Sequence, residues 1–418
     1  MTRYFLFIVK LAWKNLSRRW HRTLTTAFVI GISITSFIIT DSFFIGVDIE
    51  ATKNLVELET GMLKIFHPSF FSEKDLKNLD YTIEDPEKIS DTLKEANLNE
   101  FTFRISFFCQ LGNGVNQIPI EGYGIDPDRD ELVFNLKKYV QGEYFSSTDS
   151  AEAIIGHLVA RDLGLKIGDM VTVMTREKGG KTISAFDAKI IGIIDSPNPK
   201  INRNTIFIPL SYLQKQLNMN KSITEVVLKI QNMEKVDYTV EILKKNTKID
   251  KYDVKPWYVL GADFIAINKT KRAFSNVLIL ILLLIASLGT SNALLLSILE
   301  RIRELGMIFA LGVQKTQMIL MIVLEGICIG VFGSTIGLII ASAINLYLVN
   351  YGLTLKMFEK LSQNNDLGYP MKMVFHGAWN PDAFIFAFCF GVFISGLFSL
   401  FPAIKASRLN VVEALHYV

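Results

Sequence analysis

The chain has 418 residues, of which 50% are hydrophobic and 20% are charged, and its mean hydropathy is +0.31. This balance is too apolar for an ordinary soluble protein and too charged for a chain buried wholly in lipid, so we expect the apolar residues to be concentrated in blocks. A net charge of +3 is too small to indicate a nucleic-acid partner. The composition therefore excludes a disordered chain, a disulfide scaffold and a purely soluble enzyme.

Four apolar stretches are long enough to cross a hydrocarbon layer of about 30 Å. We predict transmembrane helices at residues 23–47, 273–299, 318–349 and 382–404. The first stretch is too long for the apolar core of a signal peptide, and no small-residue cleavage site follows it, so we predict that it is retained. The chain is thus expected to be a polytopic α-helical membrane protein with four transmembrane helices.

Lysine and arginine predict the orientation of these helices. The segments 1–22, 300–317 and 405–418 carry eleven basic residues, whereas the loop 350–381 carries three. Because short basic flanks stay in the cytoplasm, we predict that both termini are cytoplasmic and that a large domain at residues 48–272 is external.

The external block alternates strand-like and helix-like patterns. Two β-α-β patterns, at residues 61–111 and 225–257, flank four shorter strand patterns that lie at residues 153–156, 170–175, 188–195 and 205–210. We therefore predict an α+β domain made of a β-α-β subdomain with a mainly β insertion, and one continuous α+β domain is the alternative. Cys109 is the only cysteine of the block, so the block has no internal disulfide.

No catalytic or metal-binding pattern stands out. Residues 179–182 (Gly-Gly-Lys-Thr) resemble the end of a phosphate-binding loop, but Thr175 stands where that loop requires glycine, and we predict a hairpin turn. The five histidines lack metal-ligand spacing, and no G-x-S-x-G sequence occurs. We expect no catalytic residue, no metal site and no cofactor in this chain.

The segment between the second and third predicted spans, LERIRELGMIFALGVQKTQ, is too polar to cross a membrane. Ile302, Leu305 and Phe309 share one helical face, and Gly312 is placed to end the helix in a left-handed conformation. These features predict a short amphipathic helix under the membrane, within residues 300–317. A passive interfacial connector is the alternative interpretation of the same pattern.

Four stretches resemble one known family. Residues 300–326 resemble the E-R-x-R-E-[IL]-G-x-x-x-A-[LI]-G signature of ABC-transporter permeases, a group that includes lipoprotein-releasing (LolC/LolE), macrolide-efflux and FtsX-like members. Residues 142–175 and 119–127 resemble two patterns of that family's external domain. Residues 401–418 resemble its C-terminal pattern, with His416 where arginine is usual.

The resemblance implies that the amphipathic helix docks on a separate cytoplasmic ATPase, which would bind ATP and Mg. The residues that match this coupling motif are Arg301, Arg303, Glu304, Leu305, Gly306, Ala310, Leu311 and Gly312. The chain itself contains no phosphate-binding loop, so we expect two copies of the ATPase as partner chains. A second permease, identical or related, would complete the complex.

The third predicted span carries four glycines along nearly one face, at positions 326, 330, 333 and 337. Small residues at this spacing let helices approach closely, so Gly326, Gly330, Gly333 and Gly337 are predicted helix-packing residues. They would pack against other spans of this chain or against the second permease, and a locally flexible helix is the alternative. Glu325 lies in the same span, where a structural hydrogen bond is favoured over proton transfer.

The first predicted span is rich in aromatic residues. The resemblance to lipoprotein-releasing permeases implies that this span borders a cavity for acyl chains, which makes Phe37, Asp41, Phe43 and Phe44 candidate substrate-path residues. An ordinary lipid-facing surface explains the same aromatic side chains.

The resemblance further implies a bacterial inner-membrane permease that extracts lipoproteins from the lipid bilayer and hands them to a periplasmic carrier. A mechanotransmission permease that exports macrolides or peptides is the first alternative. An FtsX-like regulator of a cell-wall hydrolase is the second, and a membrane-anchored enzyme comes last.

Overall fold

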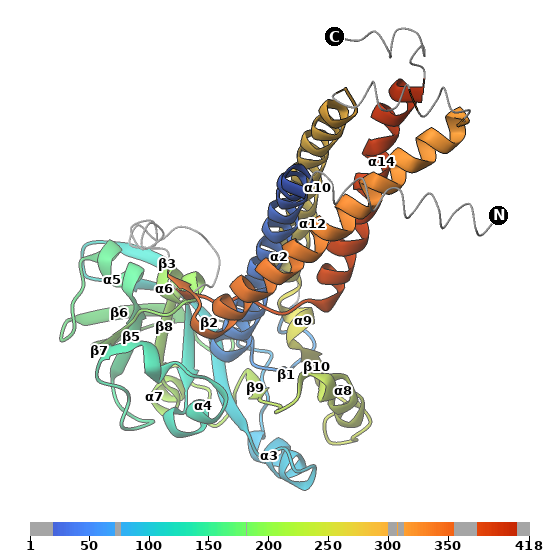
Figure 1. The fold of residues 1–418 in the computed structure, drawn as a ribbon. Coiled ribbons are helices and arrows are strands. Elements are labelled where there is room, and N and C mark those ends of the chain that lie inside the picture. Colours follow the sequence, from blue (N-terminus) through green and yellow to red (C-terminus); the bar gives the residue numbers. More distant parts are fainter. Residues whose placement is uncertain are drawn as a thin grey trace. The chain divides into compact units, whose positions relative to one another are not determined.

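The computed structural model describes residues 20–71, 77–180, 182–299, 307, 313–354 and 374–407. These residues form two compact units (Figure 1). The helical unit comprises the described parts of residues 1–48, 268–354 and 374–418, and the sheet unit comprises the described parts of residues 49–267. The predicted coupling motif and both chain ends lie outside the described residues, with the single exception of Met307.

Four long helices carry the predicted spans, namely α2 (Trp20–Leu55), α10 (Ala262–Leu299), α12 (Lys315–Tyr351) and α14 (Pro381–Ser407). Among the described residues, three helices are long and apolar enough to cross a membrane, and they correspond to α2, α12 and α14. The span predicted at residues 273–299 falls within α10, and its crossing of the membrane remains a prediction.

The helices extend beyond the apolar stretches that the sequence shows. Helix α2 continues to Leu55 and α10 already begins at Ala262, because no glycine or proline interrupts the polar turns beside either apolar stretch. Helix α12 begins at Lys315, within the segment assigned above to the amphipathic helix, and Gln314 and Gln317 form a reciprocal cap at its start. Hydropathy therefore locates the lipid-facing part of each helix, not the helix ends.

Two short strands occur in the predicted loop 350–381. Strand β11 (Leu353–Thr354) pairs antiparallel with β12 (Val374–Phe375). The residues between these two strands are not among those described.

One half of the sheet unit is built from the two predicted β-α-β units. The first unit consists of β1 (Leu63–Phe66), α3 (Pro86–Glu95) and β2 (Phe101–Gly112). The second consists of β9 (Glu225–Leu228), α8 (Val236–Lys244) and β10 (Asp253–Pro256). Their strands lie in the order β10-β1-β9-β2, and every neighbouring pair is antiparallel. The two units therefore interleave, because β9 separates β1 from β2 and β1 separates β9 from β10. This arrangement is a split β-α-β fold.

The other half is the insertion between β2 and β9. Its strands are β3 (Gln117–Ile125), β4 (Val140–Gly142), β5 (Glu152–Gly156), β6 (Met170–Arg176), β7 (Ile183–Ile194) and β8 (Thr205–Pro209). The pairings β2-β3, β3-β8, β8-β5, β5-β7, β7-β6 and β6-β2 close a ring of six strands. Strand β2 belongs to both halves, so the insertion continues the sheet as part of one α+β domain.

The insertion is mainly β, as predicted, but its helices were not predicted. It also contains four helices of six or seven residues, α4 (Pro127–Val133), α5 (His157–Leu163), α6 (Pro199–Asn204) and α7 (Leu210–Gln216). Each is too short for a 3.6-residue period to show in the sequence. Two of them start with a side-chain cap and a proline, at Asp126-Pro127 and Asn198-Pro199.

The predicted hairpin turn at residues 179–182 is confirmed by its described residues, Gly179, Gly180 and Thr182. Strands β6 and β7 pair antiparallel on either side of it. The Glu177 N–H donates to the Thr182 carbonyl at 3.1 Å, and Gly179 and Gly180 adopt φ values of +93° and +63°. Glycine permits this left-handed backbone at little cost, which explains the Gly-Gly pair without any phosphate ligand.

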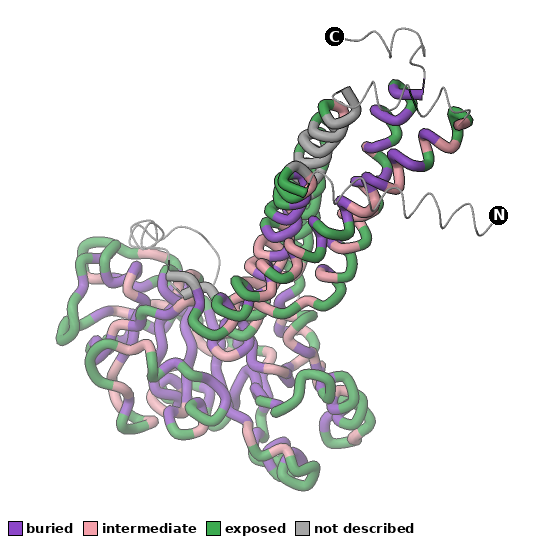
Figure 2. The backbone as a smooth tube through the Cα atoms, viewed as in Figure 1, coloured by how far each residue is buried: buried purple, intermediate pink, exposed green. Residues whose placement is uncertain are grey.

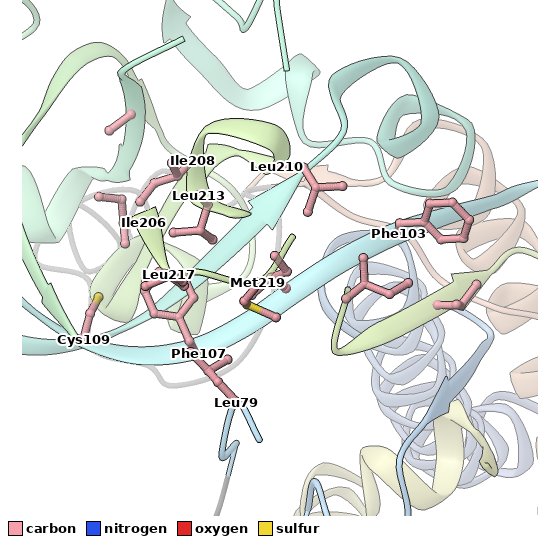
Figure 3. Close-up of a cluster of buried hydrophobic side chains, with 14 of the residues drawn as sticks. Leu79, Phe103, Phe107, Cys109, Ile206, Ile208, Leu210, Leu213, Leu217 and Met219 are labelled. Carbon is pink, nitrogen blue, oxygen red and sulfur yellow. The ribbon is translucent and has the colours of Figure 1, made fainter. Parts of the chain in front are cut away.

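A shared hydrophobic core joins both halves of the sheet unit. Phe103 and Phe107 of β2 pack in the same cluster as Ile206, Ile208 and the α7 side chain of Leu213 (Figure 3). The strands around them are largely buried (Figure 2). This cluster contains residues of both halves, which supports the view that the sheet unit is a single domain.

Candidate functional site

The first two glycines of the predicted packing face lie against α14. A Cβ atom added at Gly326 would lie 2.6 Å from the Ser399 side chain, and one at Gly330 would lie 2.8 Å from the Ser395 side chain. The Ser395 hydroxyl donates to the Gly326 carbonyl at 2.7 Å. Only glycine allows the two helices to approach this closely.

The other two glycines lie against α2. A Cβ atom at Gly333 would lie 2.7 Å from the Ala27 carbonyl oxygen, and one at Gly337 would lie 2.7 Å from the Gly31 carbonyl oxygen. The Thr35 hydroxyl donates to the Gly337 carbonyl at 3.1 Å. Helix α12 therefore uses one small-residue stripe to hold two helices of its own chain.

Hydrogen bonds fasten the residues that precede α14 to α2 and α12. The Ser42 hydroxyl donates to Asn345 at 2.5 Å and accepts from the Ala378 N–H at 3.0 Å. The Asn380 side chain donates to Asp41 at 2.8 Å. The predicted substrate-path residue Asp41 thus has a structural partner within the helical unit.

The predicted substrate-path phenylalanines differ in their surroundings. Phe37 is partly buried and its ring lies 5.8 Å from the ring of Phe386 in α14, whereas Phe43 and Phe44 pack edge to face against each other. Phe44 is exposed. Glu325 of α12 is buried and has a partner within the protein. A role for these residues in moving a substrate remains a prediction.

The coupling residues proposed above, Arg301, Arg303, Glu304, Leu305, Gly306, Ala310, Leu311 and Gly312, all lie outside the described residues. Their part in binding an ATPase therefore rests on the sequence alone.

A joint forms where the chain enters and leaves the sheet of the sheet unit, and we define it as residues 55–62 and 256–261. Helix α2 ends in a single π-helical turn, η1 (Val56–Thr60), and Gly61 then turns the chain into β1 with φ +64°. Helix α9 (Trp257–Leu260) follows β10 directly. The Trp257 N–H donates to the Met62 carbonyl at 3.0 Å, so the two passages of the chain are tied together.

The joint is also tied to the insertion. Glu57 accepts from the Asn135 side chain at 2.9 Å, and Glu59 accepts from the Asn198 side chain at 2.9 Å. Glu59 further pairs with Lys200 of α6 at 2.8 Å. A displacement of η1 therefore acts directly on two segments of the insertion.

Lys200 is part of a series of consecutive ion pairs between Glu59, Lys200, Glu121 and Lys77, which we call the ion-pair chain. Lys200 lies 3.4 Å from Glu121 of β3, and Glu121 lies 3.0 Å from Lys77. The Tyr123 hydroxyl donates to Glu121 at 2.7 Å. Burial alone would raise the pKa of Glu121, but the charges of Lys77 and Lys200 outweigh it and hold that pKa at about 2.

The lysine at the far end of this chain is deeply buried. Burial lowers the pKa of Lys77 from its usual value, although Glu121 acts in the opposite direction. Its ammonium group lies 5.0 Å from the centre of the Phe108 ring and 5.2 Å from that of Tyr123. These rings and the Glu121 carboxylate together compensate for the loss of water.

Two further ion pairs lie inside the sheet unit. Arg104 of β2 forms a bidentate ion pair with Asp130 of α4, and both N–O distances are 2.8 Å. Its guanidinium carbon lies 3.5 Å from the centre of the Phe134 ring. Lys64 of β1 pairs with Glu225 of β9 at 3.0 Å. All four charged side chains are almost completely buried.

A cavity of about 800 Å³ opens beside Lys77. It lies where β2 changes neighbours, since β2 pairs with β9 up to Arg104 and with β6 from Gln110 onward. Phe108 and Cys109 lie in this interval and line the cavity. Burial raises the pKa of the Cys109 thiol to about 12, so the thiol is not a reactive nucleophile. Within the described part of the chain, no group of three or more metal-ligating side chains occurs.

Neither the joint nor the ion-pair chain was predicted from the sequence. For the two separate buried pairs, Lys64–Glu225 and Arg104–Asp130, the available signal was a charged residue inside an apolar strand pattern, as at Lys64, Arg104 and Glu225. A charged side chain is rarely buried without a partner, so each such position predicts an ion pair. The sequence does not identify the partner residue.

Comparison with known families matches nearly the whole chain. The family described as MacB-like periplasmic core domain matches residues 23–245, just over half of the chain, and the family described as FtsX-like permease C-terminal matches residues 276–411. The chain therefore belongs to the ABC-transporter permeases of the FtsX/MacB type. Its apolar helices and periplasmic core domain indicate a protein of the inner membrane.

Two relatives illustrate the breadth of this similarity. The chain is 25% identical over 290 residues to an uncharacterized ABC transporter permease of Methanocaldococcus jannaschii, with 66% of this chain and 64% of that protein covered. It is 22% identical over 440 residues to the macrolide export ATP-binding/permease protein MacB of Campylobacter jejuni, with 97% and 60% covered. The chain thus spans about three fifths of the length of these relatives.

Among solved structures, the periplasmic region of MacB from Actinobacillus actinomycetemcomitans aligns with 50% of this chain and 94% of that chain. The TM-score is 0.35 and the sequence identity is 11%, values too low to add to the description of the fold.

Proposed function

We propose that this chain is the membrane subunit of an ABC transporter in which ATP hydrolysis by a separate cytoplasmic ATPase moves the membrane helices, and that α2 carries this movement to the periplasmic sheet unit. The observation that supports it is the unbroken course of α2 from Trp20 to Leu55, followed without a linker by η1 and β1. A helix without a flexible interruption moves as a rigid lever. In this proposal both termini are cytoplasmic.

In this proposal the ATPase binds the segment that contains Arg301, Arg303, Glu304 and Gly306. The charged side chains would fix the register of the contact, and Gly306 would allow close approach. The small-residue contacts of α12 support the same mechanism, because they join α2, α12 and α14 into one body that can move as a unit.

The test is cysteine crosslinking of positions 301–306 to the ATPase, with ATP hydrolysis measured in lipid nanodiscs. We expect crosslinks along this segment, and we expect Glu304→Ala to remove the stimulation of hydrolysis by the permease. Ile339→Ala, at an exposed position of α12, is the control with unchanged stimulation. Absence of any crosslink to the ATPase would contradict the proposal.

For the cargo, we propose lipoprotein release from the inner membrane to a periplasmic carrier. The exposed aromatic side chains Phe28 and Phe44 on α2 support a surface that faces acyl chains. Each buried CH₂ group of an acyl chain contributes about 0.8 kcal/mol, so such a surface could retain a lipid anchor. Correct sorting of lipoproteins in cells depleted of this chain would exclude this cargo.

Export of small molecules or peptides is the second candidate, and it is supported by the relative named for macrolide export that covers 97% of this chain. Co-purification with a periplasmic adaptor and an outer-membrane channel would favour export, whereas co-purification with a lipoprotein carrier would favour release. A bound cell-wall hydrolase would instead indicate an FtsX-like regulator.

A further inference from the structure

The cavity beside Lys77 has the size and lining of a small-molecule site. Its volume of about 800 Å³ lies within the range of about 300–1,000 Å³ that is usual for ligand pockets. Its apolar lining comes from Leu79, Phe107, Phe108, Pro119, Met174 and Ile183. Leu79, Phe107 and Cys109 are labelled in Figure 3. Phe108 is 44% exposed and Ile183 is 70% exposed, so large apolar side chains are available to a ligand.

The charges of the lining balance each other. Lys77 and Arg176 contribute two cations, and Asp80 and Glu177 contribute two carboxylates. The carboxylates already accept hydrogen bonds, Asp80 from the Gly179 N–H at 2.5 Å and Glu177 from an asparagine side chain at 2.7 Å. Lys77 is paired with Glu121 and Arg176 is exposed, so a charged ligand would find no free counter-charge in the interior of the cavity.

We infer that this cavity binds an uncharged, largely apolar molecule of drug size, and that its occupancy is linked to the joint through the ion-pair chain. Lys77 is common to both structures, since it lines the cavity and ends the chain that begins at Glu59. A ligand that packs on the Phe108 ring restricts the ammonium group above that ring. The restriction favours the Lys77–Glu121 pair and thereby changes how Lys200 is shared between Glu121 and Glu59.

The link works in both directions, because coupling between two sites is reciprocal. A movement of η1 that shifts Glu59 alters the pairing of Lys200, and with it the wall of the cavity. The binding site is additional to the function proposed above, whereas the consequence of the link rests on the transmission of movement through α2.

Photolabelling with benzophenone, an uncharged and photoreactive probe, tests the site. The full chain is reconstituted in lipid nanodiscs and labelled over a range of probe concentrations, and labelled peptides are identified by mass spectrometry. We expect saturable labelling of the peptides that carry Phe108 in β2 and Met174 in β6. Labelling of α2, α12 and α14 is expected as well, because the probe enters lipid, and it provides an internal standard.

Phe108→Glu places a charge in the apolar wall and should lower the labelling of β2 and β6 about fivefold relative to the standard, because a carboxylate is costly to bury beside an apolar ligand. Met233→Glu is the matched control, since Met233 is 45% exposed, belongs to η3 (Met233–Lys235) and does not line the cavity. Labelling that is confined to the membrane helices, or an equal effect of both variants, would overturn the site.

Glu59→Gln tests the link. It leaves Lys200 with Glu121 alone, which weakens the hold of Glu121 on Lys77, and we expect the half-saturating probe concentration to rise about fivefold, at the lower end of typical coupling. Glu57→Gln is the matched control on the same turn, because Glu57 accepts a hydrogen bond from Asn135 and is not part of the ion-pair chain. Equal values for the two variants would overturn the link.

These measurements need neither nucleotide nor ATPase. Saturable labelling without any crosslink to the ATPase would support the site and contradict the proposed function. Crosslinks without saturable labelling would give the opposite result.

Discussion

The two units of this protein bury polar groups in different ways. In the helical unit, small residues bring helix backbones together, and hydroxyl groups such as those of Thr35 and Ser395 donate to backbone carbonyls. In the sheet unit, large apolar side chains form the core, and whole ion pairs such as Arg104–Asp130 are buried within it. The surroundings explain the difference, because lipid gives helices no hydrophobic reason to associate, whereas water drives the sheet unit to bury large side chains.

Because the sheet unit buries whole ion pairs, we expect the largest loss of stability when one charge of such a pair is removed. Arg104→Met leaves the buried Asp130 carboxylate without its ion-pair partner and with the Thr102 hydroxyl at 3.4 Å, so we expect a loss of about 3–5 kcal/mol in the free energy of unfolding. Urea unfolding in detergent micelles, followed by fluorescence, measures it. The double variant Arg104→Met, Asp130→Leu should recover most of the loss. A loss below about 1 kcal/mol in the single variant would show that the pair does not matter for stability.

The second prediction concerns the pH dependence of the same unit. The pKa of Glu121 is about 2 in the folded protein, against an ordinary value of 4.5, so its charge stabilises the fold above about pH 4.5 and this contribution is lost as the pH falls toward 2. At about 1.4 kcal/mol per pKa unit, the contribution amounts to about 3 kcal/mol.

Glu121→Gln should remove this part of the pH dependence, whereas Glu234→Gln, on the exposed turn η3, should keep it. Unfolding measured between about pH 5 and pH 2.5 provides the comparison. The same slope for Glu121→Gln and the unsubstituted protein would mean that another carboxylate carries the effect.

The third prediction addresses the helical unit, where no charge pair is involved. Gly333→Val places atoms against the Ala27 carbonyl and the Ile30 side chain, and we expect a destabilisation of about 2 kcal/mol from overpacking. Ile339→Val introduces the same residue at an exposed position of α12 and should have little effect. Thermal unfolding in nanodiscs checks both variants, and equal midpoints would show that close packing at Gly333 is not required.

The sequence predicted those parts of the fold that depend on local patterns. Apolar stretches located α2, α12 and α14, and alternating patterns located both β-α-β units, because period and length are properties of neighbouring residues. The ring of six strands was not predictable in this way. It depends on pairings such as Gln110 with Met174 and Glu121 with Thr205, which join residues far apart in the chain.

The site was predictable only in part. The glycine spacing of α12 marked a packing face, but not its division between α14 and α2, since both helices present small or hydroxyl side chains. Lys77 gave no signal, because a lysine in a polar segment is normally exposed, and only the fold brings it beside Glu121 and over the Phe108 ring.

The joint has a mechanical consequence. Leu63 and Pro256, where the chain enters β1 and leaves β10, are direct partners at the same end of one antiparallel ladder. If α2 and α10 pulled these ends apart, the hydrogen bonds between β1 and β10 would break one after another from this end. The ladder resists this direction of force least, because only the terminal bonds carry the force at any time. A common push or tilt of both helices moves β1 and β10 in the same direction and does not pull the two strands apart. The attachment therefore tolerates concerted motion of the two helices and yields to opposed motion.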